Sequence, residues 1–128
     1  MQQKMEGKMV VVIPGENKKL IHFKYDGIVS HKDYQDIVIP LLENKLAKEE
    51  GPFRIFFDLR EMKEIEAKAI WDDYKFGIHH GKDFEKAAIV GDQWWLSPLT
   101  NLTGLFYKIK LKHFTSQQYE DALEWINQ

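Results

Sequence analysis

Two adjacent histidines, His79 and His80, lie close in sequence to Asp72, Asp73 and Asp83, and this group is the best suited in the chain to metal binding or acid–base chemistry. If the segment is helical, Asp72 and His79 are two turns apart, which separates them by about 10 Å along the helix axis. Adjacent histidines also point about 100° apart around a helix, unlike the i and i+4 pair of an HExxH zinc motif. The spacing therefore favours a solvent-exposed helix end over a metal site or a catalytic pair.

Motifs that bind phosphate or activate a nucleophile are missing. Gly91 supplies one glycine where a dinucleotide fingerprint needs three, no Lys-Ser or Lys-Thr pair follows a glycine loop, and no serine lies in a Gly-x-Ser-x-Gly elbow. The chain has no cysteine, which excludes disulfides and thiolate chemistry and suits a reducing cytoplasm. We therefore predict a protein without enzymatic activity, cofactor or metal, located in the cytoplasm.

Aromatic side chains are the strongest functional signal, since they make up 13% of the chain and include four tryptophans. Trp94 and Trp95 are adjacent, so they cannot both face one interior from a helix, and we expect at least one to be partly exposed. The candidate ligand- or partner-binding residues are Trp71, Phe76, Trp94, Trp95 and Phe106. These rings have three possible roles: filling a core and a dimer interface, forming a groove for an apolar ligand, or forming a hot spot for a partner protein.

Length and charge indicate one globular domain. The chain has 128 residues, 44% of them hydrophobic, and a formal net charge of −2, so charge gives no reason to expect nucleic acid or an anionic membrane as a partner. No apolar stretch approaches the length of a membrane span, and none at the N-terminus resembles a signal sequence. We predict a single domain over residues 1–128, with residues 1–8 as a loose N-terminus.

Apolar periodicity predicts the elements in the first part of the chain. Residues 9–13 and 20–29 have the pattern of a β-hairpin. Ser30 is a good N-cap for a helix that continues to the Glu49-Glu50-Gly51 stop. Pro40 lies inside this helix, where it lacks an amide donor and crowds the carbonyl four residues earlier, so we expect a kink near residues 36–40.

The centre of the chain predicts a βαβ unit. Residues 53–59 are almost continuously apolar, as in a strand covered on both faces. A helix follows over residues 66–80, and its spacing predicts Ile70, Tyr74 and Ile78 on the stripe that faces the sheet.

In the last part of the chain, predicted strands and helices continue to alternate. Residues 86–91 predict a strand, and Asp92 is expected to cap a helix that carries Trp94, Trp95 and Phe106. Residues 107–114 predict an edge strand with one lysine-rich face, and residues 115–116 cap a final helix. The fold class is thus α/β, a mixed β-sheet of about five strands packed by about four helices in the order ββαβαβαβα.

Several segments resemble the SpoIIAA-like family of small bacterial proteins, which shares its fold with the STAS domains of anti-sigma factor antagonists. They lie within residues 9–127 and comprise DGIVSHKDYQDIVIPLLE, FRIFFDLREM, AIWDDYKFGIHH, DFEKAAIVGDQWW and KHFTSQQYEDALEWI. The resemblance implies a mixed sheet packed by helices, often found as a dimer, with no established enzymatic activity. It favours a protein-interaction domain that binds itself or another protein. The alternative is a carrier or sensor of an apolar, lipid-like small molecule, because related folds bind lipids.

Relatives that act as antagonists bind partners near the start of the helix after the third strand, where a phosphorylated serine switches binding off. The equivalent stretch here is residues 62–69, MKEIEAKA, and no Ser or Thr occurs from His31 through Trp95. Glu64 and Glu66 carry less charge than phosphoserine, and acidic residues are expected at a helix N-terminus in any case. The resemblance therefore implies an interaction domain without a Ser/Thr phospho-switch.

Overall fold

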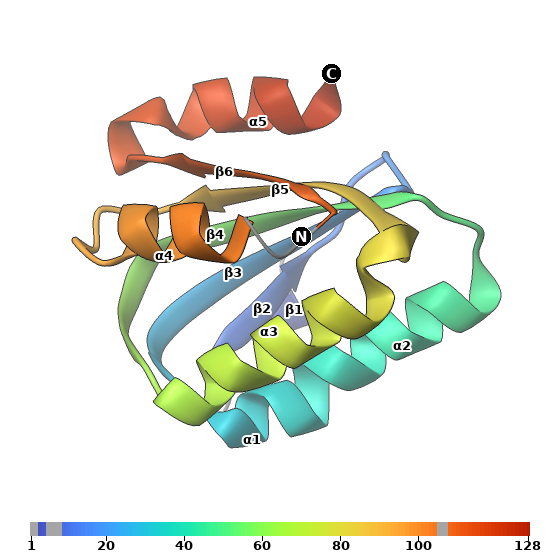
Figure 1. Ribbon diagram of the computed structural model, residues 1–128, viewed down its shortest axis with the longest axis horizontal. Coiled ribbons are helices and arrows are strands. Elements are labelled where there is room, and N and C mark those ends of the chain that lie inside the picture. Colours follow the sequence, from blue (N-terminus) through green and yellow to red (C-terminus); the bar gives the residue numbers. More distant parts are fainter. Residues whose placement is uncertain (1–2, 5–8, 105–107) are drawn as a thin grey trace.

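A mixed β-sheet organises the computed structural model, which describes residues 3–4, 9–104 and 108–128 (Figure 1). Its six strands in the described ranges lie side by side in chain order: β1 (Gln3–Lys4), β2 (Val10–Ile13), β3 (Leu20–Val29), β4 (Phe53–Ile65), β5 (Phe84–Val90) and β6 (Lys110–Phe114). The pairs from β1 to β3 are antiparallel, and those from β3 to β6 are parallel. The five predicted strands are present, and the additional β1 pairs with Val11 and Val12.

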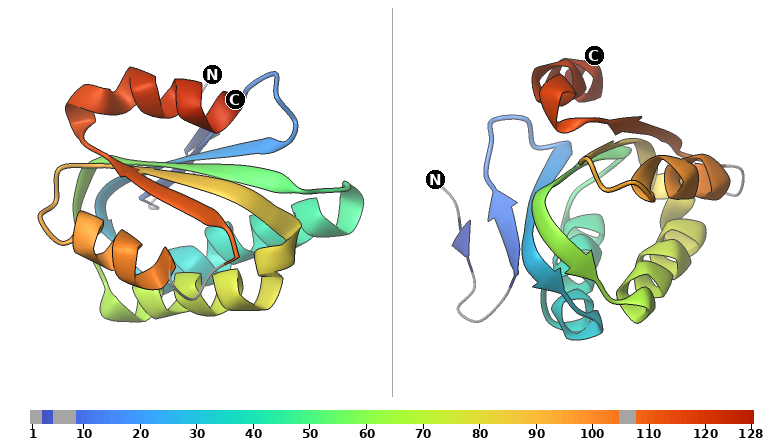
Figure 2. Two further views of the ribbon diagram at one scale, coloured as in Figure 1. Left: turned by 45° about the horizontal axis from the view of Figure 1, so that its top comes forward. Right: turned by 90° about the vertical axis from the view of Figure 1, so that its left-hand side faces the viewer.

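Helices cover both faces of this sheet. They are α1 (His31–Asp33), the π-helical turn η1 (Tyr34–Val38), α2 (Ile39–Lys48), α3 (Ala67–His80), α4 (Leu96–Gly104) and α5 (Tyr119–Asn127). Figure 2 shows α2, α3 and α4 around one side of the sheet and α5 alone on the other. From β2 onward the order is the predicted ββαβαβαβα, with α1, η1 and α2 forming the first helical segment.

Strand β4 contributes to two separate cores, as its continuous apolar run predicted. Consecutive side chains of a strand point to opposite faces. Phe57 accordingly stacks on Phe23 at 5.9 Å between ring centroids in the larger core, beneath the helices of the first side. Phe56 meets Tyr119 edge-on at 5.6 Å in the smaller core under α5. Both faces of the central strand are therefore buried.

The irregularity predicted around Pro40 is a π-helical turn. Ser30 and Asp33 form a capping box that begins the helical segment. The Ile39 amide then bonds to the Tyr34 carbonyl, one residue further back than in an α-helix. The wider turn falls where the Pro40 ring would otherwise crowd the preceding carbonyls. It also accompanies the burial of Tyr34, which is 2% exposed.

The inward face of α3 differs from the predicted stripe. Ile78 is 49% exposed, so its assignment to the sheet-facing side was wrong. Ala69 is fully buried, and Phe76 packs against Phe84 of β5 with ring centroids 6.2 Å apart. Apolar residues occur almost all round this helix, so periodicity alone did not identify the buried side.

The predicted placement of Trp94 and Trp95 in a helix was also wrong. Both lie in a turn, and α4 begins at Leu96. Asp92 does not cap that helix, because its carboxylate accepts hydrogen bonds from the Ser116 amide (2.8 Å) and hydroxyl. The Gln93 side-chain amide instead fixes the turn to the end of β4, by donating to two backbone carbonyls at 2.7 and 2.8 Å.

The edge strand β6 is shorter than predicted, since it begins at Lys110. Residue 107, where the prediction placed its start, lies outside the described residues. The side chains of Lys110 and Lys112 are exposed along β6, in agreement with the predicted lysine face.

Candidate functional site

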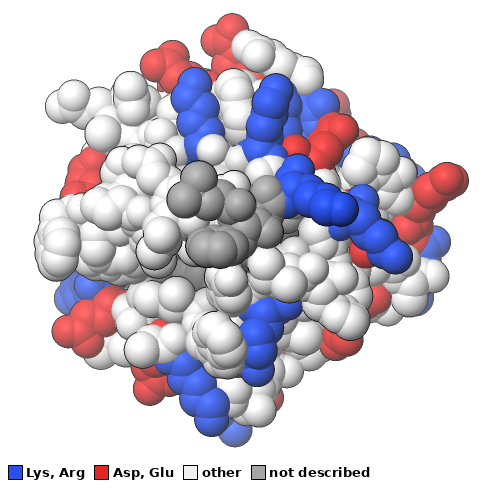
Figure 3. Space-filling view, viewed as in Figure 1, with Lys and Arg blue, Asp and Glu red and all other residues white. Residues whose placement is uncertain are grey.

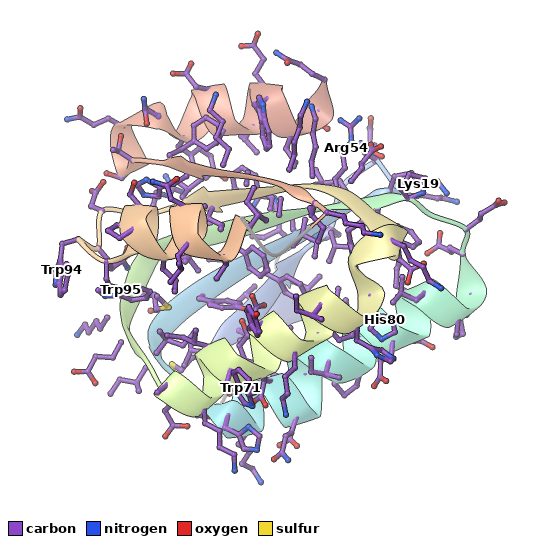
Figure 4. The ribbon with its side chains drawn as sticks, viewed as in Figure 1. Lys19, Arg54, Trp71, His80, Trp94 and Trp95 are labelled. Atoms are coloured by element: carbon purple, nitrogen blue, oxygen red, sulfur yellow. The ribbon has the colours of Figure 1, made fainter. Side chains whose placement is uncertain are left out.

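The predicted aromatic site residues that the structure describes do not form one cluster. Trp94 is 86% exposed and points away from the body of the protein, whereas Trp95 lies nearer the sheet (Figure 4). Trp71 is 55% exposed on α3 and stacks on Tyr74 at 5.5 Å. Trp95 and Phe76 line a common cavity. Phe106 lies outside the described residues.

This cavity lies between α3, α4 and strands β4 to β6, and has a volume of about 120 Å³. Its walls are largely apolar and include Ile55, Phe76, Ala87, Trp95 and Leu99. Small-molecule sites in proteins are typically concave, mostly apolar and equipped with a few polar groups. The cavity fits that description, and it is the strongest candidate site in the described part of the chain.

A chain of three polar side chains forms one wall of the cavity. The hydroxyls of Tyr25 and Tyr34 lie 2.7 Å apart, and the Tyr34 hydroxyl donates to Asp73 Oδ1 at 3.2 Å. The three residues come from β3, η1 and α3, and all of them line the cavity. The site is therefore an apolar space with a hydrogen-bonding end.

The pKa of Asp73 is raised to about 6. Removal from water is the largest cause, and the neighbouring charge of Asp72 adds to it, whereas the hydrogen bond from Tyr34 opposes it. Burial also raises the pKa of the Tyr25 and Tyr34 hydroxyls well above the ordinary value. At neutral pH the two tyrosines are thus hydrogen-bond donors, and Asp73 is largely ionised.

The predicted cluster of histidine and aspartate residues is dispersed in the structure. Asp72 contacts Nδ1 of His31 at the start of α1. His80 Nδ1 lies 3.4 Å from Asp83 Oδ2 at the far end of α3. In the ranges 3–4, 9–104 and 108–128, no group of three or more potential ligands is arranged to hold a metal ion.

Glu66, the residue before α3, has a structural role. Its carboxylate accepts a hydrogen bond of 2.7 Å from the backbone amide of His31. An acceptor is needed there because the first amides of a helix have no partner within it. The carboxylate therefore holds the beginnings of α1 and α3 together.

Sequence reasoning missed the polar wall of the cavity. Tyr34 is buried and lines the cavity together with Asp73, which sequence reasoning considered only as a member of the group of histidine and aspartate residues. The available signal was that Asp73 lies four residues after Ala69, which predicts a common helix face.

Fold and site together define an α/β protein with a STAS-like sheet and a small apolar cavity beneath its helices. The chain belongs to the SpoIIAA-like family, whose model matches residues 20–127. It is similar to the crystal structure of an uncharacterized DUF3478-family protein with a SpoIIAA-like fold from Shewanella loihica PV-4. The TM-score is 0.73 and the sequence identity is 29%, over 98% of each chain.

None of the curated proteins compared with this chain matches it. Within the described ranges, no helix is long and apolar enough to pass through a lipid bilayer.

Proposed function

We propose that this protein binds a small apolar molecule in the cavity between α3, α4 and the sheet. The observation that carries the proposal is a volume of about 120 Å³ with mainly apolar walls, next to the Tyr25–Tyr34–Asp73 chain. Well-packed interiors contain few voids larger than a water molecule. A cavity of this size represents lost packing energy, which an apolar ligand would restore.

The volume limits the size of the ligand. An apolar cavity of about 150 Å³ holds a molecule of the size of benzene. The enclosed part of the ligand is therefore a single ring or a short alkyl group, shorter than the long acyl chain that a lipid carrier would enclose.

Binding without catalysis is the activity we propose for this site. The two tyrosines stay protonated at neutral pH and are poor nucleophiles, and Asp73 is the one carboxylate among the described residues that line the cavity. We further propose that the chain acts as a single SpoIIAA-like domain and that it is located in the cytoplasm. We also propose that it has no Ser/Thr phospho-switch, because residues 31–95 contain no Ser or Thr.

Titration with toluene, followed by two-dimensional amide NMR, tests the proposal. Amide shifts are expected in β5, α3 and α4 around the cavity. Leu99→Phe places a larger ring in the cavity and is expected to weaken toluene binding at least tenfold. Leu102→Phe is the matched control, because it makes the same change on the same helix at a side chain that is 57% exposed. Absence of toluene binding to the wild type, or an equal loss of toluene affinity in the two variants, would refute the proposal.

A second candidate function is self-association through the surface of α4. This helix has no charged residue, Leu102 on it is 57% exposed, and Trp94 in the turn before it is 86% exposed. Figure 3 shows the corresponding uncharged area, with charged groups mostly around it. Exposed tryptophan surrounded by neutral surface is typical of interface hot spots. A second copy of the chain is the proposed partner.

Sedimentation equilibrium tests this second function. The wild type is expected to form a dimer that Trp94→Ala weakens at least tenfold. Trp71→Ala is the control, because Trp71 is also exposed but lies on α3. A monomeric wild type would exclude self-association, and equal effects of the two variants would exclude α4 as the interface.

A further inference from the structure

The carboxylate of Asp73 has one oxygen left for a ligand. Oδ1 accepts the hydrogen bond from Tyr34, and no described residue is seen to donate a hydrogen bond to Oδ2. Asp73 is only partly covered, and it lines the cavity. Because Asp73 lines the cavity, Oδ2 is the carboxylate oxygen that remains available to a molecule bound there.

Among the described residues, no positively charged side chain acts on the carboxylate of Asp73. The titratable groups that act on it are the hydroxyl of Tyr34 from η1 and the carboxylate of Asp72 from α3, and Tyr25 of β3 lies behind Tyr34. Asp72 already contacts His31. The polar side chains that α4 contributes to the cavity lining are those of Thr100 and Thr103, and both are uncharged. A carboxylate that is partly removed from water and has no cation beside it is in an unfavourable arrangement, which a cationic group would relieve.

We propose that the natural ligand is a small primary amine, with an apolar body of about one ring and an ammonium group paired with Asp73 Oδ2. This inference rests on the proposed function, since it identifies the class of molecule that enters the same cavity. A carboxylic acid of the same size would place a second anion beside Asp73 and Asp72. An alcohol would satisfy the acceptor but leave the charge unbalanced.

Calorimetric titrations with benzylamine, toluene and benzoate at pH 7.5 test the inference, because the three molecules share a ring and differ in the polar group. Benzylamine is expected to bind at least tenfold more tightly than toluene, and benzoate more weakly than either. Asp73→Asn is expected to abolish the preference for benzylamine, because the amide keeps an acceptor for Tyr34 but carries no charge. Asp121→Asn removes the same charge from an exposed position on α5 and is expected to leave the preference unchanged.

Binding at different pH values provides a test that needs no variant. Amines stay protonated between pH 5 and pH 7.5, whereas Asp73 takes up a proton as the pH falls through about 6. The affinity for benzylamine is thus expected to fall about tenfold between pH 7.5 and pH 5, and that for toluene to stay constant.

The outcomes separate this inference from the proposed function. Toluene binding as tight as that of benzylamine, or a preference that survives in Asp73→Asn, would overturn the amine assignment and leave the apolar site intact. Failure of both toluene and benzylamine to bind would overturn both. If Asp73→Asn does not fold, the wild-type ranking of the three molecules and its pH dependence decide the question.

Discussion

The Tyr34 hydroxyl donates a hydrogen bond of 3.2 Å to Asp73 Oδ1, and this bond connects the π-helical turn to α3. The same hydroxyl lies 2.7 Å from that of Tyr25 in β3, so the three residues form one continuous polar chain beside the cavity. Such a chain gives the molecule a group that titrates near neutral pH within apolar surroundings. Its consequences for stability can be measured without knowing the ligand.

Asp73 is expected to make the protein less stable above pH 6 than below it. Its folded-state pKa of about 6 exceeds the ordinary value of 3.8, so the folded protein binds the proton more tightly than the unfolded chain. Stability is gained as the pH falls through 6 towards 4, and the ionised form costs about 3 kcal/mol at pH 7.5. Asp73→Asn is therefore expected to stabilise the protein by roughly 1–3 kcal/mol at pH 7.5 and by much less at pH 4. Urea denaturation across this pH range measures the effect, and parallel pH profiles of the two proteins would contradict it.

Tyr34→Phe is expected to destabilise the protein through its effect on two neighbours. It removes the donor to Asp73 and leaves the buried Tyr25 hydroxyl without that partner. A buried polar group that loses its partner costs about 1–3 kcal/mol, and more when the partner is charged. The loss should be larger at pH 7.5, where Asp73 is ionised, than at pH 4. Equal losses at both values, measured by urea denaturation, would show that the bond to the anion contributes little.

Two adjacent alanines of β5 are expected to differ in how much stability is lost when each is replaced by leucine. Ala87 lines the cavity, whereas Ala88 is fully buried in the smaller core under α5. Ala87→Leu should stay within about 1 kcal/mol of the wild type because the added methyl groups enter empty space, whereas Ala88→Leu should cost about 3 kcal/mol through overpacking. Thermal unfolding of the two variants compares the two sides of one strand. A larger loss for Ala87→Leu would argue that the cavity is not present in solution.

The adjacent tryptophans are also expected to differ in their contributions to stability. Trp95 packs against the main core, and Trp94 is 86% exposed. Trp95→Ala should cost about 3 kcal/mol, whereas Trp94→Ala should change the free energy of unfolding by less than about 0.5 kcal/mol. Chemical denaturation of dilute protein separates these effects from any self-association. Similar losses for both variants would place Trp94 in a packed environment that the structure does not show.

Much of the fold was predictable because it depends on local patterns. Ser30 as an N-cap and the disturbance before Pro40 follow from the hydrogen-bonding capacity of single residues. The double-sided burial of β4 follows from its unbroken apolar run. The exposure of at least one of Trp94 and Trp95 was predicted because the two residues are adjacent. Their side chains do differ in exposure, but the two residues lie in a turn and not in a helix.

The order of strands and helices, the family and the lack of a Ser or Thr hydroxyl in residues 31–95 thus follow from the amino-acid sequence without the structure. The packing of the elements was needed to show that Phe76, and not Ile78, faces inward, and that Asp73, Tyr34 and Tyr25 form a polar chain beside a cavity. The physical reason is that a cavity is the volume left between packed elements. Its polar wall combines side chains from three of these elements, so no local pattern of residues encodes either feature.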